Sequence, residues 1–148
     1  MGFGVVSLDS LVQFDSLRGL SIAGMYHSGS QPDHQDTVSD FSALAELHSL
    51  VDLSVDDCRF FDDDALLCVT RIPNLREFTL SSFMNTVADI TVLSRAKQLV
   101  KLDIAGYAKW HFSHSFWSNL FRGYHCELDR QIQELRIALP NCEIVASA

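Results

Sequence analysis

The segment Leu50-Val51-Asp52-Leu53-Ser54-Val55 is one of four copies of the pattern L-x-x-L-x-L, in which an apolar residue fills every L position. The other copies begin at Leu17, Leu75 and Leu99, so that successive copies are offset by 33, 25 and 24 residues. The L-x-L step is the alternation of a β-strand that turns its apolar side chains to one face. We therefore predict four parallel strands, centred on residues 20–22, 53–55, 78–80 and 102–104.

The repeated pattern extends beyond the hexad on both sides. Positions nine, six and three residues before each leading leucine, and eight residues after it, are apolar in all four copies. Apolar residues three positions apart lie on one face of a helix, and here that helix would lead into the strand. A unit of about 20–29 residues is too small to bury its own apolar face, so copies must stack to bury it. The four columns hold Leu8, Phe41, Leu66 and Ile90; Leu11, Leu44, Val69 and Leu93; Phe14, Leu47, Ile72 and Ala96; and Met25, Cys58, Phe83 and Tyr107.

Over about residues 8–107 the chain resembles the leucine-rich repeat family. The second copy is the most specific, because Cys58 ends its strand segment and Phe61-Asp62-Asp63 follows, as in the cysteine-containing, F-box-type subclass. The close of the chain is similar to that of bacterial leucine-rich repeat proteins. The resemblance implies an α/β fold, a short right-handed solenoid with a parallel sheet on one face and helices on the other. It implies a scaffold that binds protein, and no particular chemistry.

The pattern stops after Tyr107, and we expect residues 108–148 to cap the stack, so that 1–148 form a single domain. Residues 116–124 and 127–139 each have the apolar spacing of an amphipathic helix. The aromatic segment 110–124 has a second interpretation, an exposed patch that binds a partner. Leu139-Pro140-Asn141-Cys142 repeats the turn Ile72-Pro73-Asn74-Leu75, which predicts a fifth strand near 142–145.

Composition and charge exclude several classes of protein. The 148 residues suffice for one domain, and 47% apolar with 20% charged residues is ordinary for a globular chain. Nineteen acids against eleven bases give a net charge of −8, which disfavours nucleic acid and anionic membranes as partners. Four scattered cysteines and the lack of a secretory signal in the first residues predict a cytoplasmic protein.

The sequence carries no signature of catalysis. It lacks G-x-S-x-G, G-x-x-x-x-G-K-S/T, G-x-G-x-x-G and H-E-x-x-H, so we expect no enzyme, no cofactor and no metal. We expect Asp62-Asp63-Asp64 to begin a helix rather than to hold a cation. A metal-dependent enzyme is the least favoured alternative, and its candidate ligands are His111, His114, His125 and Cys126, or His27, Asp33, His34 and Asp36 in a polar loop at 27–36 that we expect to be solvated.

The favoured hypothesis is a protein-interaction module that binds on the concave, open face of the sheet. Strand alternation turns to this face a set of small and mildly acidic residues. We therefore expect a basic segment of a partner protein as the ligand. Self-association through open strand edges or the aromatic segment is the alternative. The candidate partner-binding residues are Asp52, Ser54, Asp56, Glu77, Thr79, Lys101 and Asp103.

Overall fold

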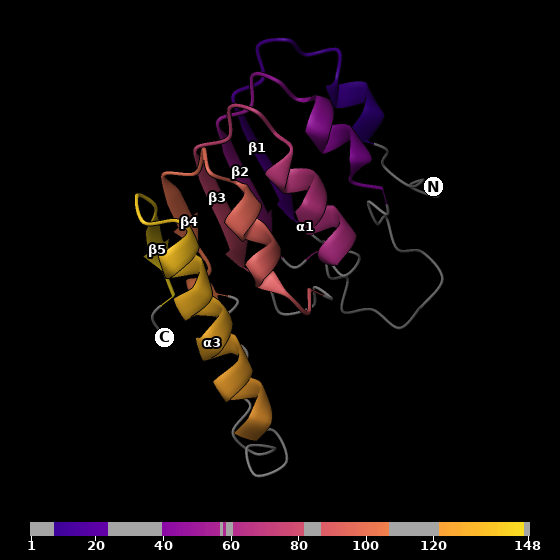
Figure 1. Cartoon of the computed structure of the whole chain (residues 1–148). Coiled ribbons are helices and arrows are strands. Elements are labelled where there is room, and N and C mark those ends of the chain that lie inside the picture. The colour runs from indigo at the N-terminus through magenta and orange to yellow at the C-terminus, as the bar shows by residue number, and fades with distance from the viewer. Residues whose placement is uncertain are drawn as a thin grey trace, which may run out of the picture.

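The structure is a computed structural model that describes residues 8–23, 40–56, 58, 61–81, 87–106 and 122–146, with side chains from residue 127 onward in the last range. These residues form an α/β fold around one five-stranded parallel sheet. The strands follow one another in chain order, β1-β2-β3-β4-β5, and the sheet does not close on itself (Figure 1). The predicted loop 27–36, the aromatic segment 110–121 and the side chains of His125 and Cys126 lie outside the described residues.

All five predicted strands are present and adjacent. Their register aligns the hexads, because Leu53 of β2 stands opposite Leu20 on one side and Phe78 on the other. The fourth strand is one residue shorter than predicted: Ile104 lies beyond β4, although its backbone N–H still donates to the carbonyl of Val145 at 2.8 Å. The bounds are β1 Gly19–Ala23, β2 Asp52–Asp56, β3 Glu77–Ser81, β4 Lys101–Asp103 and β5 Glu143–Val145.

The segments before the first four strands are helical, as predicted, but three of them are 3₁₀ helices. Apolar residues at every third position fit both helix types. They match the three residues per turn of a 3₁₀ helix better than the 3.6 of an α-helix. The 3₁₀ helices are η1 Leu8–Leu11, η2 Ser42–Glu46 and η3 Ile90–Arg95, and the α-helices are α1 Asp63–Thr70 and α3 Arg122–Ala138.

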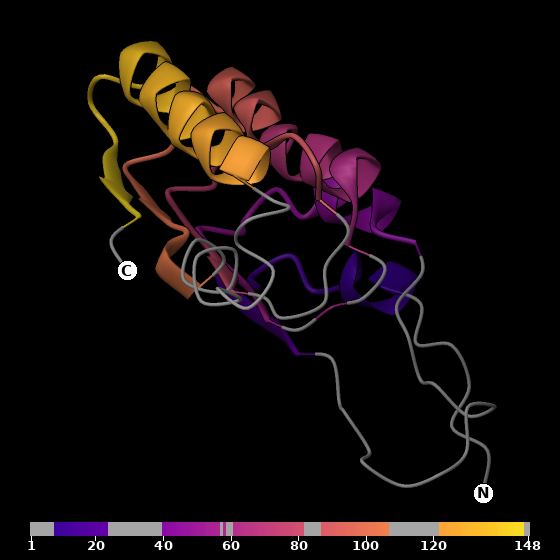
Figure 2. The same ribbon diagram turned by 90° about the horizontal axis from the view of Figure 1, so that it is seen from below.

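These helices lie in one layer against one face of the sheet (Figures 1 and 2). Inward-facing strand residues such as Leu53 and Leu80 are fully buried, and so are Leu66 and Leu93 from the helices. Aromatic rings join neighbouring units, since Phe61 packs edge-on against Phe41 with ring centroids 5.0 Å apart. The layer between sheet and helices is therefore one continuous apolar core.

The helix predicted at 127–139 is present and begins earlier, at Arg122. Its predicted apolar face is buried and packs toward η3, and Pro140 follows the residue after its last turn. The helix therefore covers the end of the helix layer, as expected of a cap. No helix among the described residues is both long enough and apolar enough to cross a bilayer. The buried residues of α3 and of the turn after it are Leu128, Ile132, Leu135 and Leu139.

Candidate functional site

The face of the sheet away from the helices carries all seven residues that the sequence singled out. We call it the open face. Its side chains form three rows across the strands, because the register places corresponding positions side by side. The helices η1, η2, α1, η3 and α3 all lie on the other face. On the open face, Gly106, in the helical turn after β4, lies against the Ser81 side chain. The rows are Gly19, Asp52, Glu77, Lys101 and Glu143; Ser21, Ser54, Thr79, Asp103 and Val145; and Ala23, Asp56 and Ser81.

The first row sets two carboxylates beside each other. Asp52 and Glu77 are exposed and stand directly opposite in neighbouring strands. Strand neighbours lie about 4.8 Å apart, and like charges at this distance destabilise a sheet. Neither carboxylate forms an ion pair with a described residue, although Lys101 is the next neighbour of Glu77 in the row. The pair is therefore free to accept a cationic side chain.

Two further carboxylates of the open face, those of Asp56 and Asp103, are held in place by hydrogen bonds. The Asp56 carboxylate accepts a hydrogen bond from the Ser81 hydroxyl at 2.6 Å. The Asp103 carboxylate accepts one from the backbone N–H of Ala105 at 3.0 Å. These bonds fix the direction of two negative groups, Asp56 in the third row and Asp103 in the second, whereas Asp52 and Glu77 in the first row form no ion pair with a described residue.

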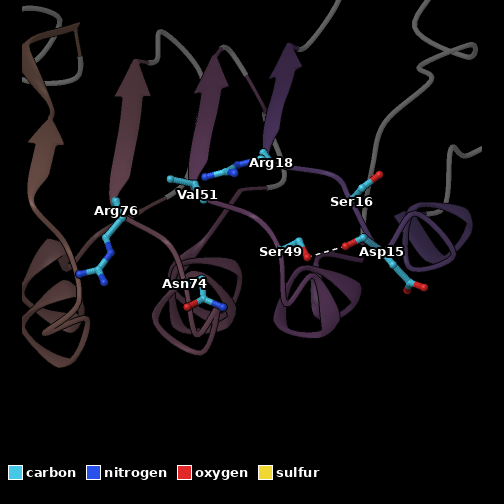
Figure 3. A pocket seen from close by; sticks show the side chains of 7 residues that line it. All are labelled: Asp15, Ser16, Arg18, Ser49, Val51, Asn74 and Arg76. Carbon is cyan, nitrogen blue, oxygen red and sulfur yellow. Dashed lines mark hydrogen bonds between the residues drawn. The ribbon is translucent and has the colours of Figure 1, made fainter.

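A second feature lies at the edge of the sheet where the strands begin. A hollow of about 590 Å³ lies beneath β1, β2 and β3, and we call it the amino-end hollow. Figure 3 shows the side chains that line it. Arg18, Val51 and Arg76 stand directly before these strands, and the turns from the preceding helices form the remainder of the wall. The lining residues are Asp15, Ser16, Arg18, Ser49, Val51, Asn74 and Arg76.

Side chains of successive turns tie the wall of this hollow together. The Ser49 hydroxyl donates to the carbonyl of Asp15, and the Asn74 amide donates to the carbonyl of His48 at 2.7 Å. The Gln98 amide continues the series with a bond to the carbonyl of Ile72 at 2.8 Å. Each turn is thus bonded to the turn of the preceding unit, which makes the wall a fixed surface.

The sequence reasoning missed this hollow, although the signal was in the repeat itself. Its strand-starting residues fill the position after the leading leucine of each hexad. That position alternates between arginine and valine, in the order Arg18, Val51, Arg76 and Val100.

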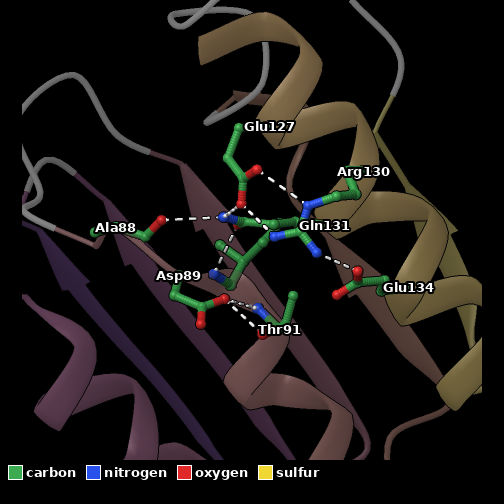
Figure 4. A network of polar contacts seen from close by, with 8 residues as sticks. Ala88, Asp89, Thr91, Glu127, Arg130, Gln131 and Glu134 are labelled. Carbon is green, nitrogen blue, oxygen red and sulfur yellow. Dashed lines mark hydrogen bonds and ion pairs between the residues drawn. The ribbon is translucent and has the colours of Figure 1, made fainter. Parts of the chain in front are cut away.

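A polar network fixes α3 to the unit before it (Figure 4). Gln131 is only 4% exposed, and its side-chain oxygen accepts from the backbone N–H of Ile90 at 3.1 Å. Its amide nitrogen donates to the carbonyl of Ala88 at 3.3 Å and to Glu127 at 3.1 Å. Arg130 forms ion pairs with Glu127 and Glu134. Hydrogen bonds from Arg130 and then from Gln131 lower the pKa of Glu127 from 4.5 to about 2.

The acidic run at the start of α1 is structural, as expected. The Asp62 carboxylate caps the helix by accepting from the backbone N–H of Ala65 at 2.9 Å. The Asp63 carboxylate accepts from the backbone N–H groups of Ala88 and Asp89, at 2.9 and 3.1 Å. These two carboxylates therefore hold backbone groups, one within the helix and one in the segment before η3.

Within the residues that the structure describes, no group of three histidine, cysteine, aspartate or glutamate residues could hold a metal ion. The candidate metal ligands fall outside the residues whose side chains are described; they are His27, Asp33, His34, Asp36, His111, His114 and His125.

Burial raises the pKa of the Cys68 and Cys142 thiols, which keeps both protonated at neutral pH.

Comparison of the chain with known protein families, with curated proteins and with solved structures found no match in any of the three.

Proposed function

We propose that this protein is a non-catalytic interaction module of the leucine-rich repeat kind, a short right-handed solenoid whose open face binds a basic segment of another protein. The observation that carries the proposal is the pair Asp52 and Glu77, exposed side by side at the centre of the first row without a bonded cation among the described residues.

Two properties of the sheet support the solenoid. Its five parallel strands follow chain order, and equivalent positions of successive units stand opposite each other along the sheet. Stacked repeats produce this arrangement, because each unit contacts only its neighbours. Parallel strands joined through helices on one face favour right-handed crossovers.

The charge of the open face supports the kind of partner. It holds the carboxylates of Asp52, Asp56, Glu77, Asp103 and Glu143 against the single ammonium group of Lys101. A lysine or arginine placed between Asp52 and Glu77 would remove their mutual repulsion and gain charge-assisted hydrogen bonds. The small residues of the second row leave room for an extended chain to lie across the strands.

The test uses a charge reversal on the open face against a matched reversal on the helices. The probe is a fluorescent peptide of alternating arginine and serine, followed by anisotropy at low and physiological salt. We expect Asp52→Lys with Glu77→Lys to weaken binding at least about tenfold. The control is Glu46→Lys with Asp129→Lys, which changes the net charge equally at exposed helical positions and should leave most of the binding. Equal losses in both variants would show only general attraction to an acidic protein and would contradict the proposal.

A second candidate function is self-association through the β1 end. Phe14 is 53% exposed there, and Leu17 and Leu20 beside it are half-buried. The outer edge of β1 pairs with no described strand, and free strand edges are sites of intermolecular pairing. Light scattering over a hundredfold range of concentration tests it, since a mass that stays that of the monomer excludes assembly by this route.

A further inference from the structure

The amino-end hollow presents two arginines whose charge no described carboxylate neutralises. Arg18 and Arg76 are exposed, and neither forms an ion pair with a described residue. Arg76 donates one hydrogen bond, to the carbonyl of Gln98 at 3.2 Å. A guanidinium has five N–H donors in a planar fork, so most donors of both side chains remain open to a ligand.

The surroundings of the two arginines favour an anion. Arg71 and Arg95 lie at the C-terminal ends of α1 and η3 on the same side of the sheet, where their charge offsets the negative ends of the helix dipoles, but neither lines the hollow. Asp15 is the only carboxylate among the lining residues, and Figure 3 shows its side chain directed away from both arginines. The negative charge of the open face lies on the opposite side of the strands, because Asp52 and Glu77 follow Val51 and Arg76 and point the other way.

The spacing of the arginines specifies the shape of the ligand. They begin β1 and β3, with β2 between them, so their backbones lie about 9.6 Å apart at about 4.8 Å per strand. A polyproline II chain rises about 3.1 Å per residue and has three residues per turn. Residues i and i+3 of such a chain therefore share one face at about 9.3 Å, close to the separation of the two arginine backbones.

The middle of the hollow favours an uncharged segment between the two anionic groups. Val51 stands at the start of β2, half-buried, and Figure 3 shows Arg18 extending from β1 toward it. Ser49 and Asn74 already donate to backbone carbonyls, so they shape the wall and leave recognition of charge to the arginines.

From this geometry we propose that the amino-end hollow binds an extended acidic peptide segment of a partner protein, with two carboxylates three residues apart and small apolar residues between them. Each carboxylate pairs with one guanidinium, and the apolar residues lie over Val51. This site is separate from the open face and takes a ligand of opposite charge.

The experiment compares three labelled peptides of equal length by fluorescence anisotropy on the full chain. One contains E-A-P-E, one contains E-E-A-P with adjacent carboxylates, and one contains Q-A-P-Q. We expect E-A-P-E to bind at least about fivefold more tightly than E-E-A-P, and Q-A-P-Q not to bind. Equal affinity for the two acidic peptides, or no binding of E-A-P-E, would overturn the proposal.

Matched variants locate the site. Arg18→Gln with Arg76→Gln should weaken E-A-P-E binding at least about tenfold. Arg71→Gln with Arg95→Gln removes the same charge at the same side of the molecule, and should change the affinity less than about twofold. Similar losses in both double variants would contradict a specific site. Circular dichroism spectra that match the wild-type spectrum are the check that each variant is folded.

Two further measurements distinguish peptide binding in the amino-end hollow from binding at the open face and from binding of a second copy of the chain. Asp52→Lys with Glu77→Lys should leave the preference for E-A-P-E over E-E-A-P intact, so a failure of the open-face proposal does not affect this one. If the Arg18 and Arg76 substitutions instead dissociate an oligomer and leave peptide binding unchanged, the occupant is a second copy of the chain and the peptide proposal is wrong.

Discussion

Phe14 and Ile72 occupy the same position of two repeats, three residues before the leucine that leads into a strand. Phe14 is 53% exposed, whereas Ile72 is fully buried. The difference arises because the unit of Ile72 has a neighbour on each side, while the first unit packs against η2 and β2 alone among the described residues. An apolar column therefore specifies where a side chain points, and the number of neighbouring units determines how much water it loses.

The largest expected effect compares a charge at equivalent strand positions of the two regions. Leu53→Asp places an unpaired carboxylate between two units at a fully buried position, and we expect a loss of more than about 4 kcal/mol, enough to unfold the protein. Leu20→Asp makes the same change at the half-buried edge and should cost about 1–2 kcal/mol, because water still reaches the side chain. Urea denaturation followed by circular dichroism measures both, and equal losses would contradict the comparison.

A cavity in the core is expected to have a smaller effect. Phe78→Ala removes a side chain that is 1% exposed and should lower the free energy of unfolding by about 3–5 kcal/mol. Phe14→Ala removes the same ring from the exposed position and should change it by less than about 1 kcal/mol. The midpoint of thermal unfolding tests the pair, and a large loss at Phe14 would mean that the first unit is covered in solution.

The smallest expected effect is the loss of stability in acid through Glu127 of α3. The pKa of Glu127 is about 2 in the folded protein against 4.5 ordinarily, so its contribution to stability is complete above about pH 4.5 and is lost as the pH falls toward 2. Between these values the free energy of unfolding should fall less steeply in Glu127→Gln than in the wild type. Asp129→Asn, two residues further along α3, is the matched control and should keep the wild-type slope. Parallel curves for Glu127→Gln and the wild type would contradict this assignment.

The strands and their register were predictable because apolar alternation determines both at once. Leu20, Leu53, Phe78 and Leu102 could be aligned only if the hexads stacked side by side. The helix type was not predictable in the same way, since a spacing of three is compatible with either a 3₁₀ or an α-helix. The exposure of the first unit was missed because burial depends on neighbours and not on the residue itself.

The two candidate sites differ in the same way in how far the sequence predicts them. Alternation along each strand was enough to assemble the open face, and the structure brings all seven predicted residues onto it. The amino-end hollow depends on turns that meet only after the units stack. Its polar contacts, such as Asn74 to the carbonyl of His48, join residues 26 positions apart and leave no local pattern.

The bonds between successive turns have a mechanical consequence. Ser49, Asn74 and Gln98 each hold the turn of the unit before them, and the strands pair in the same order. A force that pulls the two ends of the described fold apart would break these bonds one unit after another. It would not load all strands of the sheet in shear at the same time. The half-exposed first unit should detach first under tension, which makes resistance to pulling a stepwise property of this protein and its weakest step the one nearest β1.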